Sequence, residues 1–199
     1  MKSLFPVLVL ILFQAFAASL YSSEPDESSG GNRGLIIGFG GSTFVGSASS
    51  GENNKFLPGM ILGFFQDFPV KPHFDLEAGI QFSTKGSRLD AVGDLYLHQV
   101  VTYLELPVQA TWMFLPGKKA NPFLAGGTFF GIKLLAFNEV GFPEEINGLD
   151  VGLDFAAGVR LNRVRFKLEF KQGLLDVDQG STQLNYKNLS LYFVTGISF

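Results

Sequence analysis

The sequence predicts an all-β protein, an eight-stranded antiparallel up-and-down transmembrane β-barrel. From residue 34 onward, apolar residues alternate with polar or small residues at the two-residue period of a β-strand. Long and short connections alternate between these segments, which is typical of barrels that cross an outer membrane. The charged face also carries most of the glycines, which suits the crowded interior of a small barrel better than a solvated surface.

The composition is typical of one apolar domain. The chain has 199 residues, 46% hydrophobic and 17% charged, with no cysteine and a net charge of -3. An average protein has about 25% charged residues. The scarcity of charge and the lack of a basic stretch exclude a nucleic-acid partner. The lack of cysteine excludes a disulfide scaffold, a thiolate metal site and a lipid anchor on cysteine.

The N-terminal residues predict export. Residues 1–17 have the pattern of a signal peptide, with Lys2 before an apolar run over 4–16 and small residues at Ala15 and Ala17. The run is shorter than the about 20 residues of a spanning helix, and we expect cleavage after Ala17. We expect residues 18–33 to form a flexible periplasmic tail and residues 34–199 to form the outer-membrane barrel domain.

Three segments show the strand pattern most clearly. In 73–85 the even positions from Phe74 are apolar or uncharged, and Asp75 and Glu77 begin the opposite face. Residues 149–161 and 164–172 alternate in the same way, and Asn162-Arg163 joins them as a hairpin turn. The expected strands are 35–44, 56–68, 73–85, 97–114, 122–135, 149–161, 164–172 and 188–199.

The connections predict how the barrel lies in its membrane. Outer-membrane barrels have short periplasmic turns and longer outer loops, and an even strand number places both termini in the periplasm. The long connections are the expected contact surface, and Phe137, Val140 and Phe142 make the third of them unusually apolar. The long connections are 45–55, 86–96, 136–148 and 173–187, and the short ones are 69–72, 115–121 and 162–163.

The charged face predicts an interior network of ion pairs. A soluble β-sandwich or a lipocalin-like carrier would instead turn the apolar face inward. Six basic residues balance six acidic ones, as buried charges require, because an isolated one costs several kcal/mol, roughly. The balanced set is Asp67, Asp75, Glu77, Lys85, Glu105, Lys133, Asp154, Arg160, Arg165, Lys167, Glu169 and Lys171.

Aromatic residues on the apolar face predict a girdle at the membrane–water interface, which such rings favour. These rings lie at the strand ends nearest the short turns, at Phe68, Phe74, Trp112, Phe114 and Phe199. Phe199 also ends the last strand, which resembles the signal that the barrel-assembly machinery recognises. Because lipid leaves no partner for an open sheet edge, the first and last strands must pair.

No residue pattern predicts catalysis, a cofactor or a metal. Asp75 and Glu77 lie two apart, as glycosidase carboxylates can, but neighbouring cations explain them and no cleft is implied. The two histidines, His73 and His98, fall near opposite barrel ends, so neither a shared metal site nor a Ser-His-Asp triad is expected.

Two local patterns have competing explanations. Pro107, two residues after Glu105 on the inner face, either kinks its strand to open a pocket or serves as a packing device. Residues 176–180 resemble the start of a calcium loop, but the twelfth position is Lys187 rather than glutamate, which favours a solvated loop.

The segment order resembles the PorT-like family of small outer-membrane β-barrel proteins. The resemblance rests on PGMILGFFQDFPV (58–70), FDLEAGIQFSTKGSRLD (74–90), YLELPVQATWMF (103–114) and the C-terminal LYFVTGISF. It implies an eight-stranded barrel in the outer membrane of a diderm bacterium, and some members are linked to protein secretion.

The expected function is that of a non-enzymatic outer-membrane barrel with a structural or binding role. Side chains should fill the interior and prevent free conduction. The expected partners are outer-membrane lipid, the assembly machinery and secretion or envelope proteins. The alternatives are a component of an outer-membrane secretion or transport system and a soluble exported lipocalin-like carrier.

Overall fold

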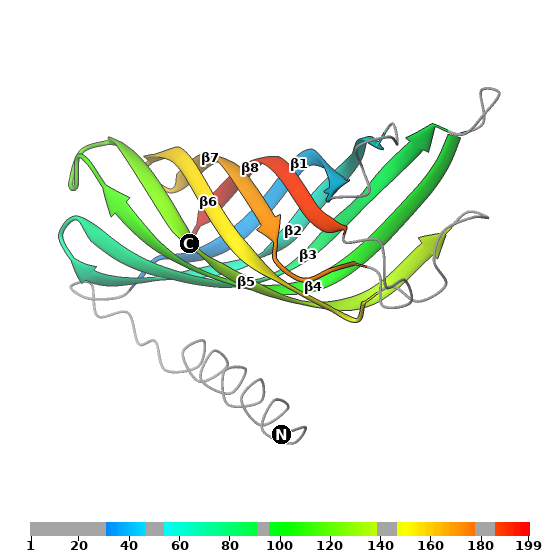
Figure 1. Cartoon of the computed structure of the whole chain (residues 1–199). Helices are drawn as coiled ribbons and strands as arrows, with labels where there is room; N and C mark the ends of the chain where they lie inside the picture. Colours follow the sequence, from blue (N-terminus) through cyan, green and yellow to red (C-terminus); the bar gives the residue numbers. More distant parts are fainter. Residues whose placement is uncertain (1–30, 47–53, 91–95, 139–146, 178–185) are drawn as a thin grey trace, which may run out of the picture. The chain divides into compact units, whose positions relative to one another are not determined.

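Eight antiparallel strands, hydrogen-bonded in chain order, close into one barrel (Figure 1). The computed structural model describes residues 31–46, 54–90, 96–138, 147–177 and 186–199. The expected signal peptide and most of the expected tail lie outside these residues. The strands are β1 (Arg33–Val45), β2 (Asn54–Lys71), β3 (Phe74–Asp90), β4 (Tyr96–Met113), β5 (Ala120–Asn138), β6 (Leu149–Leu161), β7 (Val164–Gly173) and β8 (Lys187–Ser198).

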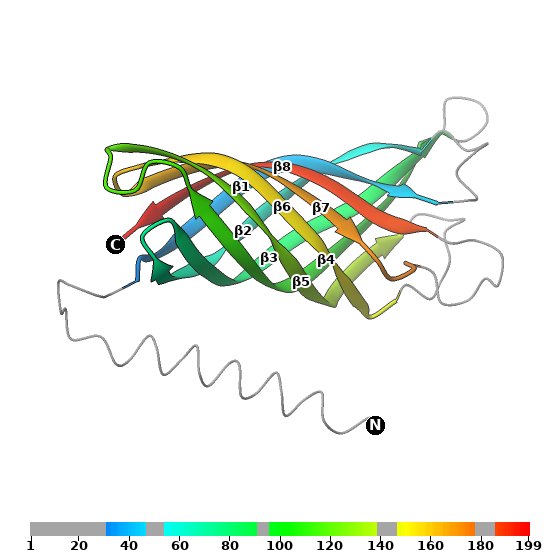
Figure 2. The same ribbon diagram turned by 60° about the vertical axis from the view of Figure 1, so that its left-hand side comes forward.

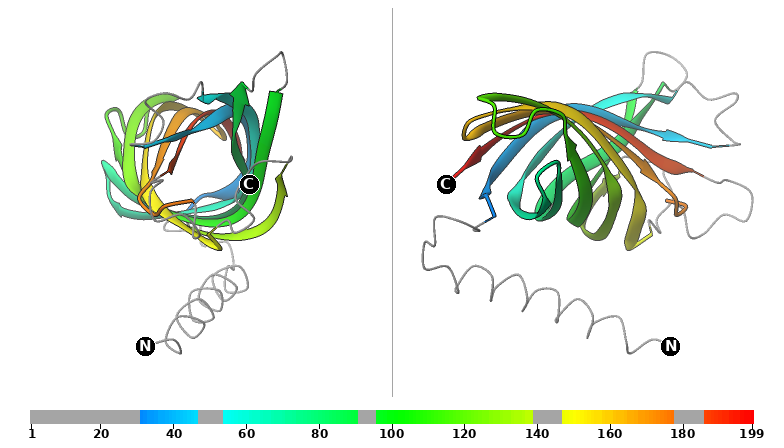
Figure 3. Two further views of the ribbon diagram at one scale, coloured as in Figure 1. Left: turned by 45° about the vertical axis from the view of Figure 1, so that its right-hand side comes forward. Right: turned by 90° about the vertical axis from the view of Figure 1, so that its left-hand side faces the viewer.

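Pairing of the first and last strands completes the ring. β1 pairs with β2 on one side and with β8 on the other (Figure 2). Ile36 is therefore opposite both Gly63 and Gly196. This closure leaves neither strand with an open edge, as a sheet in lipid requires. The view into the ring in Figure 3 shows the strands surrounding the interior. Buried side chains occupy this interior.

The alternation in sequence places apolar side chains outside and charged ones inside. On β3, Phe82 is 50% exposed on the outer face, whereas its neighbours Gln81 and Ser83 are buried. On β6, Phe155 is exposed and Asp154 is fully buried. The barrel is therefore inverted relative to a soluble protein, with its apolar surface on the outside.

The interior has an apolar part and a charged part. An apolar cluster lies on β1, β2 and β8 and comprises Ile36, Ile61, Phe65, Tyr192 and Val194. The buried charged residues come mainly from β3, β4, β6 and β7.

The two barrel ends differ in the connections that they carry. The short-turn end holds residues 72–73, 114–119 and 162–163, with the start of β1 and the end of β8. Asn162 has a φ of 51°, a left-handed conformation that asparagine tolerates in tight hairpin turns. The long-loop end is the opposite one, where β1 joins β2, β3 joins β4, β5 joins β6 and β7 joins β8.

Several strands are longer than their side-chain pattern predicts. β3 extends to Asp90 rather than to 85, and β5 to Asn138 rather than to 135, so residues 86–90 of the expected second loop are strand. A strand of about 9–11 residues spans a membrane, whereas β2 and β4 have 18 residues each. The backbone ladder thus continues outward where the apolar alternation ends. β4 ends at Met113, so Phe114 belongs to the turn.

A local irregularity in β2 is bridged by side chains. The β2–β3 register shifts between Phe56 and Ile61. There the Ser42 hydroxyl of β1 accepts from the Gly86 N–H (2.6 Å) and donates to the Gly86 carbonyl (3.0 Å). The Thr84 hydroxyl accepts from the Met60 N–H (2.7 Å). Hydroxyl groups therefore replace the backbone pairs that the bulge removes.

In the described part of the chain, no helix is both long and apolar enough to cross a membrane.

Candidate functional site: the barrel interior and its mouth

Ion pairs join buried charges from neighbouring and distant strands, starting at the short-turn end. Arg160 on β6 contacts Asp67 (Nη2 to Oδ2, 3.0 Å) and Asp75 (Nη1 to Oδ2, 3.2 Å). Arg165 on β7 shares the Asp67 carboxylate at 2.5 Å and also pairs with Glu77. The two guanidinium groups thus tie β2 and β3 to β6 and β7 across the interior.

Two lysines of β7 continue the chain of ion pairs along the barrel. The Lys167 Nζ lies 3.3 Å from the Glu77 Oε1 and 2.7 Å from the Glu169 Oε2. The Lys171 Nζ lies 3.1 Å from the Glu169 Oε1 and 3.0 Å from the Glu105 Oε2. Each lysine therefore bridges two of these three carboxylates, which offsets the desolvation of all five groups.

The last ion pairs of the series lie toward the long-loop half of the barrel. Lys171 also contacts the Asp154 Oδ2 at 3.2 Å. Lys85 on β3 lies 2.6 Å from the Glu105 Oε1 and 2.8 Å from the Asp150 Oδ2. One connected set of side chains therefore fills much of the interior.

The connected set differs in two positions from the balanced set that the sequence suggests. Asp150, which the alternation places on the inner face, is an additional member. Lys133 lies half-buried near the outer end of β5, beside the bulge between Thr102 and Tyr103. The described ion pairs join five basic residues (Lys85, Arg160, Arg165, Lys167 and Lys171) and seven acidic ones (Asp67, Asp75, Glu77, Glu105, Asp150, Asp154 and Glu169).

Aromatic rings inside the barrel make cation–π contacts with the buried cations. The Arg165 guanidinium lies 3.6 Å from the centre of the Phe65 ring, and the Lys85 Nζ lies 4.0 Å from that of Phe129. Cations favour the face of an aromatic ring, because the ring carries negative charge there. These inward phenylalanines are separate from the outward aromatic residues that the sequence singles out.

An apolar cluster lies inside the barrel at the long-loop end. Val177, which follows β7, is buried among Phe44, Val101 and Tyr103, with Tyr186 packed against the group. Backbone hydrogen bonds hold the segment in place, because the Val177 N–H donates to the Tyr186 carbonyl and the Val177 carbonyl accepts from the Asn147 N–H, both at 2.7 Å. We call this cluster the stopper. Sequence alternation could not reveal it, because Val177 lies in a connection and reaches its partners only in the folded ring.

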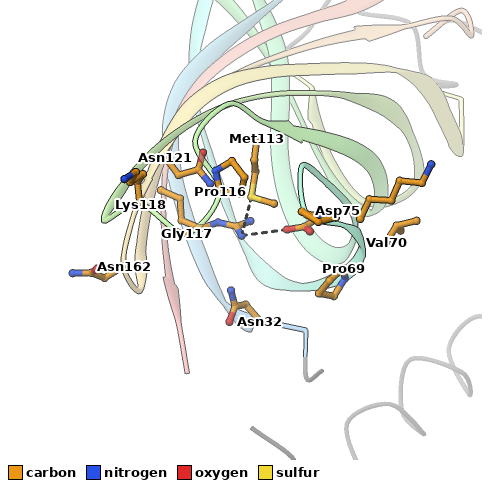
Figure 4. A pocket seen from close by; sticks show the side chains of 13 residues that line it. Asn32, Pro69, Val70, Asp75, Met113, Pro116, Gly117, Lys118, Asn121 and Asn162 are labelled. Atoms are coloured by element: carbon orange, nitrogen blue, oxygen red, sulfur yellow. Dashed lines mark hydrogen bonds and ion pairs between the residues drawn. The ribbon is translucent and has the colours of Figure 1, made fainter. Parts of the chain in front are cut away.

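The short-turn end instead has a pocket of about 460 Å³ (Figure 4). Arg160 lies in it, donating to the Asp75 carboxylate and lying 3.8 Å from the Met113 sulfur. The pocket lies between the β2–β3 and β4–β5 turns and the β6–β7 hairpin. Its lining residues are Asn32, Pro69, Val70, Lys71, Pro72, Asp75, Met113, Pro116, Gly117, Lys118, Asn121, Arg160 and Asn162.

The residues with competing explanations are placed as follows. Pro107 is buried, and its ring lies against Gly79, where an added Cβ would come within 3.3 Å of the ring. This contact favours the packing device over a kink that opens a pocket. The Glu105 carboxylate accepts from the Gln81 side chain at 2.9 Å in addition to its ion pairs.

The histidines lie on different elements. His73 is exposed in the β2–β3 turn, where Nδ1 is 2.9 Å from the Met113 carbonyl oxygen and the ring stacks on Trp112. His98 falls on β4 toward the long-loop end. Over the described ranges, no group of three or more His, Cys, Asp or Glu residues could hold a metal ion. The calcium-like segment begins at Asp176, and its residues 178–180 lie outside the described part, as do Val140 and Phe142.

The five aromatic residues expected to form the girdle lie at the short-turn end. Phe68, Trp112, Phe114 and Phe199 are exposed there, and Phe74 is half-exposed. The Phe199 N–H donates to the Arg33 carbonyl at 2.9 Å, which places the last residue beside the start of β1.

Comparison with solved structures shows the same fold. Neisserial surface protein A (NspA) superposes with a TM-score of 0.51 at 10% identity, covering 84% of this chain and 97% of that one. OprG from Pseudomonas aeruginosa gives a TM-score of 0.50 at 14% identity, covering 85% and 94%. No curated protein matches the sequence.

The sequence also matches a family directly. Residues 22–179, most of the chain, match the outer membrane protein beta-barrel domain. This match agrees with the closed eight-stranded ring and with the apolar outer surface. The chain belongs to the family of outer membrane protein beta-barrel domains.

Proposed function

We propose that this protein is a non-enzymatic barrel of the bacterial outer membrane that serves a structural or binding role and does not conduct solutes freely. The single observation that supports this proposal is the connected set of ion pairs through the interior, with the stopper above it. A lumen filled in this way leaves no continuous water path of the kind that porins provide.

The chemistry of the interior supports a non-enzymatic role. The carboxylates on the inner face are held by lysine or arginine at 2.5–3.3 Å, so they are committed to ion pairs rather than free to act on a substrate. His73 lies in an exposed turn, where its Nδ1 is 2.9 Å from the Met113 carbonyl oxygen, and it is outside the buried network of carboxylates.

The proposed topology follows the asymmetry of the connections. Residues 1–17 serve as a signal peptide, residues 18–33 as a periplasmic tail, and the short-turn end with both termini faces the periplasm. The long-loop end then faces outward, and its loops are the contact surface. Phe68, Phe74, Trp112, Phe114 and Phe199 form the girdle in the inner leaflet, and β8, with Phe199 directly after it, is the element that the assembly machinery engages.

The narrower assignment is to the PorT-like group. Its support is the three consecutive segments 58–70, 74–90 and 103–114. They lie on β2, β3 and β4, which carry the β2–β3 register shift and the inward Pro107. Secretion or envelope proteins are the partners that this assignment suggests.

Recording in planar lipid bilayers tests the proposed function. Heat-modifiable gel mobility first establishes that the detergent-extracted protein is a folded barrel, and an open porin in the same bilayers shows that insertion and recording work. The filled interior predicts no steady, large conductance from this protein. A stable open level comparable to that of the porin would contradict the proposal.

A further inference from the structure

The pocket at the short-turn end has the size of a small-molecule site. Its volume of about 460 Å³ lies within the range of about 300–1,000 Å³ that ligand pockets occupy. Its lining residues come from the short-turn end, at the opposite end of the barrel from the stopper. We propose that this pocket binds an organic phosphate, that is, a phosphate ester with an apolar or glycerol-like body.

Exposed cations surround the entrance of the pocket. Lys71 and Lys118 line it, from the end of β2 and from the β4–β5 turn, and both are exposed. Lys119 and Arg163 follow on the same end without lining the pocket. Among the described residues of the three short turns, every exposed charged side chain is basic, which makes the entrance attractive to anions.

The acidic groups near the pocket are already paired. Asp75 lines the pocket but is buried, and its carboxylate accepts from Arg160 Nη1 at 3.2 Å. Asp67 behind it is shared by Arg160 and Arg165. The Nε of Arg160 is buried without a hydrogen-bond partner. The wall of the pocket therefore includes a guanidinium group whose two carboxylate partners are both buried.

Neutral donors add hydrogen-bonding capacity for phosphate oxygens. The Asn121 Oδ1 accepts from the Leu115 N–H at 3.0 Å, which leaves its amide NH₂ as the group for a ligand acceptor. Asn32 and Asn162 also line the pocket. Ammonium and amide donors around one space suit a phosphate group, which offers several strong acceptor oxygens.

The remaining wall is apolar and sets the nature of the ligand body. Pro69, Val70, Met113 and Pro116 line this part of the pocket (Figure 4). A free inorganic ion would leave these surfaces in contact with water, whereas an ester covers them. A lipid headgroup and a soluble phosphate ester share this chemistry.

Calorimetric titration of the folded barrel in a nonionic detergent tests the proposal. The probes are sn-glycerol 3-phosphate and lysophosphatidylglycerol, with glycerol and lysophosphatidylcholine as the matched neutral and zwitterionic compounds. We expect saturable binding of at least one anionic probe. The double variant K71Q/K118Q should weaken that binding by about tenfold or more, because two charge-assisted contacts are lost.

A second double variant separates the pocket from general surface charge. K119Q/R163Q removes the same charge from the same end without touching the lining, and it should change affinity by less than about twofold in physiological salt. All four positions are exposed, and heat-modifiable mobility checks that both variants fold.

The outcomes distinguish the two ligand sources. Binding of glycerol 3-phosphate supports a soluble ester, and binding confined to lysophosphatidylglycerol supports a lipid headgroup. The proposal is overturned if neither anionic probe binds saturably, or if the two double variants lose affinity equally. Either failure leaves the closed-barrel function untouched, because conductance does not depend on the pocket.

Discussion

At the residue scale, the barrel depends on charges that lie where a soluble protein would have its apolar core. Arg165 illustrates this, because it is 1% exposed, contacts Asp67 and Glu77, and lies against the Phe65 ring. Removing such a group leaves its carboxylates short of a partner in a dry interior. Arg165 therefore holds the short-turn half of the interior together.

Replacing Arg165 with methionine should lower the free energy of unfolding by about 3 kcal/mol, the lower end of the penalty for breaking a buried ion pair. The remaining contacts of Asp67 with Arg160 and of Glu77 with Lys167 keep the loss at that lower end. Urea unfolding in lipid vesicles, followed by the fluorescence of Trp112, the single tryptophan, measures it.

Arg163 provides the matched control, since it is an exposed arginine two residues earlier. R163M should change the free energy of unfolding by no more than about 0.5 kcal/mol. Equal losses for R165M and R163M would show that the buried network does not stabilise the barrel.

At the element scale, each strand separates the barrel interior from the outer surface. The adjacent glycines Gly126 and Gly127 of β5 lie on these two different faces. An added Cβ at Gly127 would lie 2.0 Å from the Val108 carbonyl oxygen of β4. At Gly126 the nearest atom would be a Phe155 ring carbon at 3.4 Å. G127A should therefore lower the free energy of unfolding by about 2 kcal/mol, a typical penalty for overpacking.

G126A serves as the control for the same chemical change on the outer face. It should alter the free energy of unfolding by about 0.5 kcal/mol or less. The same urea titration compares the two variants, and a reversed order of stability would contradict the assignment of the inner face.

The sequence predicts a strand well where one of its faces meets only the barrel interior and the other meets only the outer surface. On β3 and β6 the alternation identifies the faces of Asp75, Phe82, Asp154 and Phe155 correctly. It underestimates strand length, because a backbone ladder needs no apolar side chains to continue to Asp90.

The parts of the candidate site that depend on long-range contacts escape sequence reasoning. Val177 reaches Phe44 and Tyr103 only after the ring has closed. The pocket likewise forms from three turns that are far apart in the sequence. Exposed lysines such as Lys71 and Lys118 occur in many solvated turns, so their presence in the sequence does not indicate a pocket. The alternation places Asp150 on the inner face. Its ion pair with Lys85 could not be predicted from the sequence, because the two residues lie on β6 and β3, which are not neighbours in the barrel.

At the scale of the whole molecule, the described interior changes in character along the barrel. The stopper lies at the long-loop end, the ion pairs lie in the middle, and the pocket lies at the short-turn end. All of this follows from one inversion, in which the apolar face of every strand turns outward and leaves the interior to polar groups. The inversion is thus the central claim.

Quenching by phospholipids with brominated acyl chains tests the inversion most directly. With Trp112 replaced by phenylalanine, a single tryptophan is placed at Phe82, which is 50% exposed on β3, or at Phe129, which is 1% exposed on β5. Both changes are Phe→Trp, so they differ only in the face of the barrel. In brominated vesicles, we predict strong quenching of the F82W protein and little quenching of the F129W protein. Equal quenching of the two, or stronger quenching of F129W, would contradict the account.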